Sequence, residues 1–179
     1  MAQARIARFE KVSWEQFFAD WKKVFSDAVS DPAELSEEKI RVIYDGIKLP
    51  RRATAGSAGY DFFLPVDLSL SAGEGALIPT GIRVKMDPAW VLCCFPRSGL
   101  GFKYRLQLDN TVGIIDADYY GSDNEGHMFT KVTCDARTDR RLDLAAGDAF
   151  MQAVFLPYGL TEDDDAANIR NGGFGSTDS

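Results

Sequence analysis

Two stretches of the sequence offer the kinds of groups that bind phosphate. Residues 96–101 (Pro-Arg-Ser-Gly-Leu-Gly) follow an apolar segment and supply a guanidinium, a hydroxyl and glycine N–H groups that an anion can approach closely. Residues 170–177 combine Arg170 with glycines, hydroxyls and one aromatic ring, Phe174, which could stack on a base. A structural turn and a disordered tail are the alternatives, and the residues alone leave both open.

A third stretch, residues 110–121, is the richest in acids and aromatics. It is interpreted as two apolar arms around a hairpin that carries glycine and aspartate. Carboxylates such as Asp116 and Asp118, placed beside Tyr119 and Tyr120, can be partly desolvated, which brings a carboxylate closer to use as a general base. The alternative is a hairpin whose aspartates cap turns and whose tyrosines pack in the core.

Several other kinds of site are excluded or disfavoured. Residues 170–177 lack the lysine of a Walker A loop and do not open a helix, so a P-loop is rejected. His127 is the single histidine and stands in the polar loop 122–127, which predicts an ordinary surface residue rather than a metal ligand. Cys93, Cys94 and Cys134 are odd in number and lack metal spacing, which predicts reduced thiols that pack in the interior.

Composition and charge narrow the function further. The formal net charge of −7 opposes a general attraction to nucleic acid, so we expect no nucleic-acid partner. No apolar run approaches the length of about 20 residues that a membrane helix needs. Residues 1–8 are basic but lack the apolar region of a secretory signal, so a cytoplasmic protein is expected.

The first forty residues predict a helical extension. Ser13 and Gln16 fit a capping box, and bulky apolar residues recur at helical spacing from Trp14 to Val29. The helix should end near Pro32, and its aromatic face should pack on the core or on a neighbouring subunit. Residues 39–49 are interpreted as a strand, because Ile40, Val42 and Tyr44 alternate with polar positions.

From residue 40 onward, short apolar runs are separated by Gly, Pro, Asp and Asn. Such runs predict an all-β sandwich or barrel. The expected strands are 60–64, 75–78, 82–86, 90–95, 106–108, 128–132 and 150–156. Residues 161–179 are acidic and then glycine-rich, which predicts a flexible C-terminal arm. The chain is therefore divided into an extension (1–39), a β core (40–160) and an arm (161–179).

Five segments, taken in order, resemble the motifs of the trimeric dUTPase family. The first is Ala58-Gly59-Tyr60-Asp61, and the second is Pro96-Arg97-Ser98-Gly99-Leu100. The third covers residues 113–119 with Asn110 just upstream, the fourth is Gly147-Asp148 leading to Gln152, and the fifth joins Arg170 to residues 172–177. Each motif alone is weak, whereas five in register over roughly residues 40–179 are specific.

The resemblance implies an all-β, jelly-roll-like subunit in a homotrimer with shared active sites. It implies hydrolysis of dUTP to dUMP and pyrophosphate, with Mg²⁺ bound mainly by the triphosphate. By this resemblance Asp116 is the general base, Tyr119 lies under the deoxyribose, and Asn110 with the backbone near Gly113 reads the uracil edge.

The remaining residues are assigned to the phosphates and the metal on the same basis. By the resemblance Asp61 organises Mg²⁺ through water. The residues expected to hold phosphate oxygens are Arg97, Ser98, Gly99 and Gln152. The arm is expected to close with Arg170, Ser176 and Thr177 on the distal phosphates and with Phe174, followed by Gly175, over uracil.

Two rival functions remain. A dCTP deaminase on the same fold would need a catalytic glutamate in a different core motif and would lack the Arg170 and Gly-Gly-Phe arm. A regulatory protein could instead use the nucleotide as a ligand. Asp116, Tyr119 and the arm favour the hydrolase over both.

Overall fold

The structure is a computed structural model that describes residues 4–168 and 170. Strands dominate it, and most of them are short. The strands are β1 (Ala7–Lys11), β2 (Arg51–Arg52), β3 (Tyr60–Phe63), β4 (Leu68–Leu70), β5 (Gly75–Pro79), β6 (Ile82–Met86), β7 (Trp90–Pro96), β8 (Leu106–Leu108), β9 (Gly113–Ile115), β10 (Phe129–Cys134), β11 (Leu142–Leu144) and β12 (Ala149–Pro157). The helices are α1 (Trp14–Phe25), α2 (Glu37–Gly46) and α3 (Ser98–Tyr104), with 3₁₀ turns η1 (Pro32–Leu35) and η2 (Ala117–Gly121).

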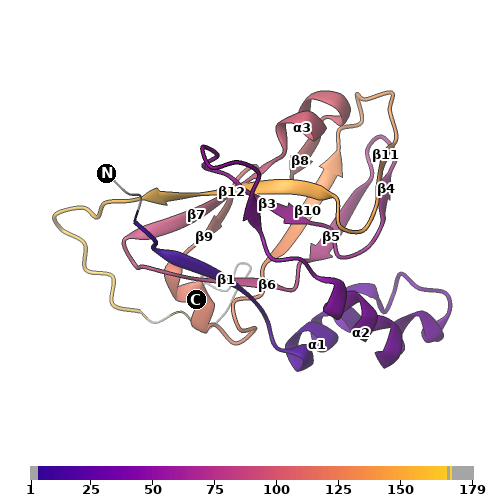
Figure 1. Cartoon of the computed structure of the whole chain (residues 1–179), viewed down its shortest axis with the longest axis horizontal. Coiled ribbons are helices and arrows are strands. Elements are labelled where there is room, and N and C mark those ends of the chain that lie inside the picture. Colours follow the sequence, from indigo (N-terminus) through magenta and orange to yellow (C-terminus); the bar gives the residue numbers. More distant parts are fainter. Residues whose placement is uncertain (1–3, 169, 171–179) are drawn as a thin grey trace.

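The strands form layers that enclose one core. The largest sheet has the order β2-β3-β12-β7-β9, and a second has the order β5-β10-β8, with smaller pairs β1-β6 and β11-β4 (Figure 1). The described ladders are antiparallel, as expected for a sandwich or barrel. Phe62, Leu92, Val132, Phe150 and Met151 are each 0 or 1% exposed between the layers. The predicted all-β, jelly-roll-like fold is confirmed.

The expected strands of the core are present, with bounds that agree to within two residues. Strands β6 and β8 begin and end where the sequence predicted them. The strands that sequence reasoning missed include β2, β4 and β11, of two or three residues each. Such short strands show no alternation of their own, because their pairing partners decide their conformation.

The strand expected at residues 39–49 is wrong, because this segment forms α2. Ile40 is fully buried, whereas Val42 is 69% exposed, so the two residues do not share a face. The buried positions Ile40 and Ile47, together with Ile43 and Tyr44 between them, follow helical spacing. Glu37 and Glu38 occupy the first turn, where acidic side chains favour a helix. The predicted boundary between extension and core falls inside this helix.

The predicted N-terminal helix is confirmed as α1, although it is shorter than expected. The Ser13 hydroxyl accepts the Gln16 N–H at 3.1 Å, which is one half of the predicted capping box. The helix ends at Phe25 rather than near Pro32, because the next three residues are exposed and no buried face continues. Strand β1, which precedes the helix and pairs with β6, was not predicted.

Helices α1 and α2 lie together at one end of the strand layers, and α3 lies at the opposite end (Figure 1). Phe17 and Trp21 of α1 are buried in the main core, which confirms that the aromatic face packs on the barrel. Every helix in the described part of the chain is too short or too polar to cross a lipid bilayer.

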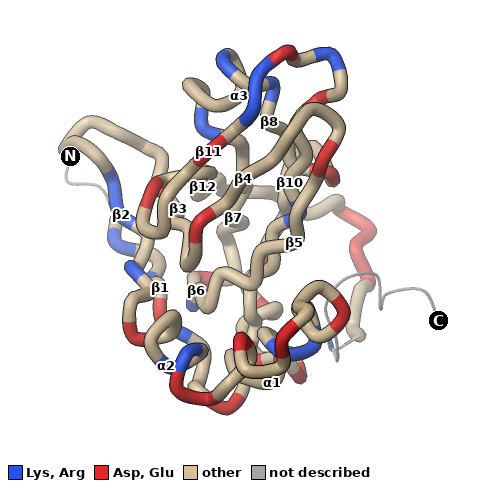
Figure 2. Tube along the Cα trace, turned by 90° about the vertical axis from the view of Figure 1, so that its right-hand side faces the viewer, with Lys and Arg blue, Asp and Glu red and all other residues tan. Residues whose placement is uncertain are grey.

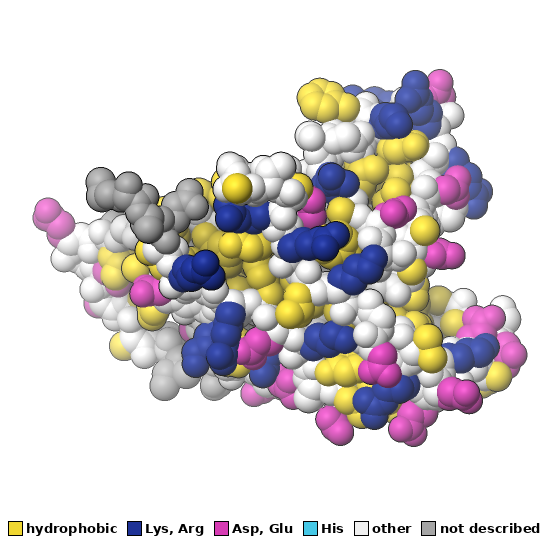
Figure 3. Space-filling model, viewed as in Figure 1, with side chains coloured by type: hydrophobic (Ala, Val, Ile, Leu, Met, Phe, Trp, Pro, Cys, Tyr) yellow, Lys and Arg dark blue, Asp and Glu magenta, His cyan; other side chains and the backbone are white. Residues whose placement is uncertain are grey.

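Charges are distributed unevenly over this framework. Figure 2 shows acidic residues along the α1–α2 end, and basic residues around β2 and near α3 and β11. Figure 3 shows basic side chains separated by apolar patches across the face seen in Figure 1. Basic side chains are therefore concentrated locally, despite the net charge of −7.

Candidate active site

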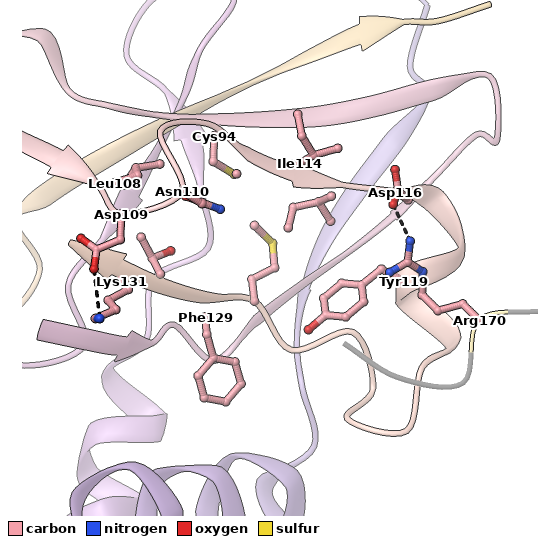
Figure 4. A pocket seen from close by; sticks show the side chains of 14 residues that line it. Cys94, Leu108, Asp109, Asn110, Ile114, Asp116, Tyr119, Phe129, Lys131 and Arg170 are labelled. Carbon is pink, nitrogen blue, oxygen red and sulfur yellow. Dashed lines mark hydrogen bonds and ion pairs between the residues drawn. The ribbon is translucent and has the colours of Figure 1, made fainter. Parts of the chain in front are cut away.

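A cavity of about 370 Å³ lies between β9 of the large sheet and β10 of the three-stranded sheet (Figure 4). This volume is in the range of small-molecule sites. The cavity is lined by Cys94, Leu108, Asp109, Asn110, Gly113, Ile114, Ile115, Asp116, Tyr119, Met128, Phe129, Thr130, Lys131 and Arg170. Five residues predicted from the sequence are therefore brought together: Asn110, Gly113, Asp116, Tyr119 and Arg170.

The segment interpreted as a hairpin is a corner between two sheets. Strand β8 pairs with β10, whereas β9 pairs with β7, so the two apolar arms are not partners of one another. A tight turn joins them, in which Thr111 has a φ of 61° and its N–H donates to Leu108 at 2.9 Å. The alternating apolar pattern was correct, but only the arrangement of distant strands decides which neighbour each arm joins.

Gly113 allows close packing where β9 enters the cavity wall. A Cβ atom at this position would lie 3.2 Å from the Cβ of Cys94 and 3.7 Å from the Asn110 amide nitrogen. A larger residue would therefore press on β7 and on the Asn110 side chain, which lines the cavity. The backbone here and the Asn110 amide offer both donors and acceptors to a ligand.

Asp116 stands at the end of β9, as the residue before η2. Its side chain is 47% exposed, and its Oδ2 accepts from Arg170 Nη2 at 2.5 Å. Arg170 Nε also donates to Asp118 at 3.0 Å, so one guanidinium spans two carboxylates. Asp118 was not included among the predicted site residues, although its place two residues after Asp116 is a signal that could have found it.

Tyr119 is 7% exposed and forms one wall of the cavity. Its hydroxyl donates to the backbone oxygen of His127 at 2.8 Å and accepts from the Asn124 amide at 2.9 Å. Burial raises the pKa of this phenol, so the hydroxyl keeps its proton. The ring is therefore fixed by its polar end, and its surface faces the cavity (Figure 4).

The opposite wall comes from β10 and the end of β8. Lys131 and Asp109 form an ion pair at 3.1 Å, and the hydrogen bond from Thr133 lowers the pKa of Asp109. Cys94 lines the cavity from β7, where burial raises the pKa of its thiol to about 12. A thiol this weakly acidic is not a nucleophile near neutral pH. Cys93, Cys94 and Cys134 are all free and buried, as predicted.

The prediction that His127 is an ordinary surface residue is wrong. The side chain is fully buried, and its Nε2 accepts the Gly81 N–H at 2.8 Å. Nε2 is therefore the unprotonated nitrogen, so the proton on Nδ1 is donated to Asp20 of α1 at 2.6 Å. The sequence predicted an exposed loop because its residues are polar. The helix that covers it, α1, is more than 100 residues away along the chain and meets the loop only in the folded protein.

Glu125 in the same loop completes the cap of α1. Its carboxylate accepts from the Ser13 N–H at 2.8 Å and from the Ser13 hydroxyl at 2.6 Å. Burial alone would raise the pKa of Glu125, but the Ser13 hydrogen bonds and Arg83 outweigh it and lower that pKa. The expected reciprocal partner, Gln16, donates to Asp20 instead. We call Ser13, Asp20, Asn124, Glu125 and His127 the support network.

A second group of predicted residues lies outside this cavity. Arg97 Nε is 3.3 Å from Asp61, and the register of β12 places Gln152 beside Asp61. Gly59 makes room for Gln152, since a Cβ there would lie 2.9 Å from the Gln152 side-chain oxygen. Ser98 and Gly99 begin α3, and nothing lies within 4 Å of a Cβ built on Gly99. We call Asp61, Arg97, Ser98, Gly99 and Gln152 the Arg97 cluster.

Within one chain, these two groups of residues do not meet in a single cavity. Arg97 and Ser98 line a separate hollow with Phe102, Arg105 and Asp135. The predicted arm residues Phe174, Gly175, Ser176 and Thr177 lie outside the described residues, as does most of the segment predicted to be flexible.

The potential metal-binding side chains are dispersed over the described part of the chain. Among residues 4–168 and 170, no group of three or more His, Cys, Asp or Glu side chains could hold a metal ion. The Asp61 side chain is 18% exposed and ion-paired with Arg97. One partly exposed carboxylate of this kind fits a Mg²⁺ ion that arrives with phosphate oxygens and keeps its own waters.

Comparisons with known proteins point to one family. The family model for dUTPase matches residues 45–178. A deoxyuridine 5'-triphosphate nucleotidohydrolase from Lactococcus lactis is 42% identical over 135 residues, which cover 74% of this chain and 89% of that protein. A protein of the same name from Shewanella baltica is 40% identical over 135 residues, covering 71% of this chain and 84% of that protein.

Solved structures agree with the sequence relatives. The crystal structure of a dUTPase from Streptococcus mutans is 40% identical, with a TM-score of 0.57, and covers 66% of this chain and 91% of that chain. A dUTPase mutant from phage phi11 of S. aureus, described with a structural Mg(II) ion, shares the fold at 22% identity and a TM-score of 0.57. The similarity covers 72% of this chain and 95% of that chain. The family match begins at residue 45, so β1, α1 and most of α2 precede it.

Proposed function

This chain belongs to the dUTPase family, and we infer that it is a dUTP diphosphatase, which hydrolyses dUTP to dUMP and pyrophosphate. The observation that carries this function is the convergence of Asn110, Gly113, Asp116 and Tyr119 on one cavity within the matched region. No finding supports a dCTP deaminase or a purely regulatory nucleotide-binding protein.

Asp116 is proposed as the general base. Its carboxylate is at the cavity edge and half exposed, so a water molecule can reach it. The water would lose its proton to Asp116 while its oxygen attacks the α-phosphorus, and pyrophosphate would leave from the opposite side. Arg170 holds Oδ2 of this carboxylate at 2.5 Å, so the guanidinium and the water compete for the same group unless Arg170 moves.

Uracil and deoxyribose are proposed to occupy the cavity. The Asn110 amide and the backbone beside Gly113 would pair with the polar edge of the base. The Tyr119 ring would lie against the sugar and leave no space for a 2′-hydroxyl. Both hydrogen-bonding positions of its hydroxyl are already used within the protein, so the ring acts through its shape.

The Arg97 cluster is proposed to hold the phosphates. The Arg97 side chain is 45% exposed, and within residues 4–168 and 170 its one ion-pair partner is Asp61, so its donors remain available to an anion. Because the cluster and the cavity are separate in one chain, we propose a homotrimer in which the cluster of one subunit completes the cavity of another. Mg²⁺, held by the triphosphate and by Asp61 through water, would neutralise charge on the phosphate oxygens.

The arm is proposed to close the site. Arg170 would exchange its two carboxylate partners for the distal phosphates, assisted by Ser176 and Thr177, and Phe174 followed by Gly175 would cover uracil. We also propose a cytoplasmic location, which the three free cysteines support, since thiols persist in a reducing compartment.

A nucleotide panel tests the function directly. Pyrophosphate release is measured with dUTP, dCTP, dTTP and UTP at equal concentrations, with Mg²⁺ present. We expect dUTP to be preferred, because the cavity has to reject the exocyclic amine, the 5-methyl group and the 2′-hydroxyl of the other three. A preference for another nucleotide, or no pyrophosphate from dUTP, would refute the proposal.

A further inference from the structure

The wall of the cavity that Tyr119 forms is supported by the N-terminal extension, which precedes the family match. Tyr119 is held by Asn124 and by the backbone oxygen of His127, both in the loop after η2. The loop is held by its own hydrogen bonds and also by contacts with the N-terminal extension. Its far side is bonded to α1, through His127 to Asp20 and through Glu125 to Ser13.

His127 connects the helix to both walls of the cavity. The ring is fully buried, and both of its nitrogens are bonded, to Asp20 and to the Gly81 N–H. Its centroid lies 4.5 Å from that of Phe129, which lines the cavity on the β10 side. A shift of this residue would therefore move Tyr119 through a hydrogen bond and Phe129 through ring contact.

The loop has little freedom to adjust independently. Gly126 has a φ of 72°, and a Cβ there would lie 2.8 Å from the backbone oxygen of Tyr119. Asn124 also bonds the Ser122 hydroxyl and the Gly126 N–H. Because these partly buried groups are bonded to one another around the fully buried His127, the network favours one geometry over several.

We propose that Asp20, Asn124 and His127 are positioning residues, through which α1 sets the placement of Tyr119 and the discrimination between deoxyribose and ribose. The inference rests on the proposed function, in which Tyr119 faces the sugar. None of the three residues lines the cavity, so each acts by keeping the tyrosine ring in place. In this chain, helix α1 therefore contributes to the discrimination between deoxyribose and ribose as well as to stability.

The test measures the ratio of kcat/KM for dUTP to kcat/KM for UTP. Asn124→Ala should lower this ratio by about 3- to 10-fold, the factor associated with one neutral hydrogen bond. Asp20→Ala should lower it by at least as much, because the carboxylate is a charged acceptor. Asp20→Asn should restore most of it, because the amide oxygen still accepts from His127 Nδ1. Glu15→Ala removes the same charge from an exposed position of the same helix and should leave the ratio unchanged.

A double-mutant cycle separates positioning from general stability. Tyr119→Phe removes the hydroxyl that the loop holds, so adding Asp20→Ala to it should lower the ratio little further. Thermal unfolding of each variant confirms that it is folded at the assay temperature. If Asp20→Ala fails to fold, Asn124→Ala and Tyr119→Phe still test the inference.

The outcomes distinguish this inference from the proposed function. Folded Asp20→Ala and Asn124→Ala variants with the wild-type ratio would overturn the positioning role, as would additive losses in the double mutant. Wild-type protein that releases no pyrophosphate from dUTP would instead refute the proposed function, before any variant is compared.

Discussion

The support network and the Arg97 cluster are both polar, yet they differ in how far the protein itself satisfies them. In the support network His127 is fully buried, and each ring nitrogen has a partner within 2.8 Å. In the Arg97 cluster the Arg97 side chain is 45% exposed, with one ion-pair contact at 3.3 Å to Asp61. Gly99 has open space around it.

This difference separates polar groups that maintain the structure from polar groups that are available to bind a ligand. A buried polar group without partners is costly, so a buried network is retained only when nearly every donor and acceptor is used. Exposed donors cost little when they are unpaired, because water satisfies them until an anion replaces it. Asp116, which is half exposed at the cavity edge, resembles the Arg97 cluster in this respect.

The largest expected effect is a loss of turnover that leaves the free energy of unfolding nearly unchanged. Asp116→Asn should lower turnover by about 10²- to 10⁴-fold, since that is what a positioned base contributes. Nucleotide binding and the free energy of unfolding should hardly change, because the carboxylate is half exposed. Steady-state pyrophosphate release and urea unfolding measure the two quantities.

Asp118→Asn is the matched control for Asp116. This carboxylate bonds the same arginine at 3.0 Å but does not line the cavity, so its loss should reduce turnover far less. Equal turnover in wild type and Asp116→Asn would remove Asp116 from the mechanism and would leave the cavity edge without its proposed role.

The second expected effect is on stability, through the support network. Gly81 has a φ of 70° and donates its N–H to His127, and a Cβ there would lie 2.3 Å from Ile47 Cδ1. Gly81→Ala should therefore lower the free energy of unfolding by about 2–4 kcal/mol, from overpacking and backbone strain together. Urea unfolding measures the change.

Gly56→Ala is the control for Gly81→Ala, because no atom lies within 4 Å of a Cβ at that position. Its stability should stay within about 0.5 kcal/mol of wild type. A similar small change for Gly81→Ala would mean that the packing of Gly81 against Ile47, at the end of α2, yields easily, contrary to the rigid contact expected there.

The smallest expected effect is a dependence of stability on pH. The pKa of Glu125 is lowered in the folded protein, so its contribution is present above the usual value of 4.5 and is lost as pH falls through the lower folded value. Wild type should therefore be more stable than Glu125→Gln at pH 7, and the difference should shrink in acid. Urea unfolding of both proteins across this range provides the measurement, and a constant difference would contradict the ionic role of Glu125.

Much of the core and five of the fourteen cavity-lining residues could be predicted from the sequence. Alternation of apolar and polar residues predicted strands such as β6 and β8, because period-two patterns survive in any sheet with one buried face. Asp116 and Tyr119 were found through a motif only seven residues long. Local patterns also misled, since Ile40, Val42 and Tyr44 alternate like a strand although the segment is helical.

By itself, the sequence determined most of the longer strands of the core, the family that the chain resembles, and the candidate residues for the chemistry. The tertiary structure alone decided that β8 and β9 pair with different strands, that the Arg97 cluster lies apart from the cavity, and that His127 is buried beneath α1. The physical reason is the sequence separation over which each effect acts. Periodicity and motifs act between neighbours along the chain, whereas the burial of a polar side chain depends on partners such as Asp20, 107 positions away.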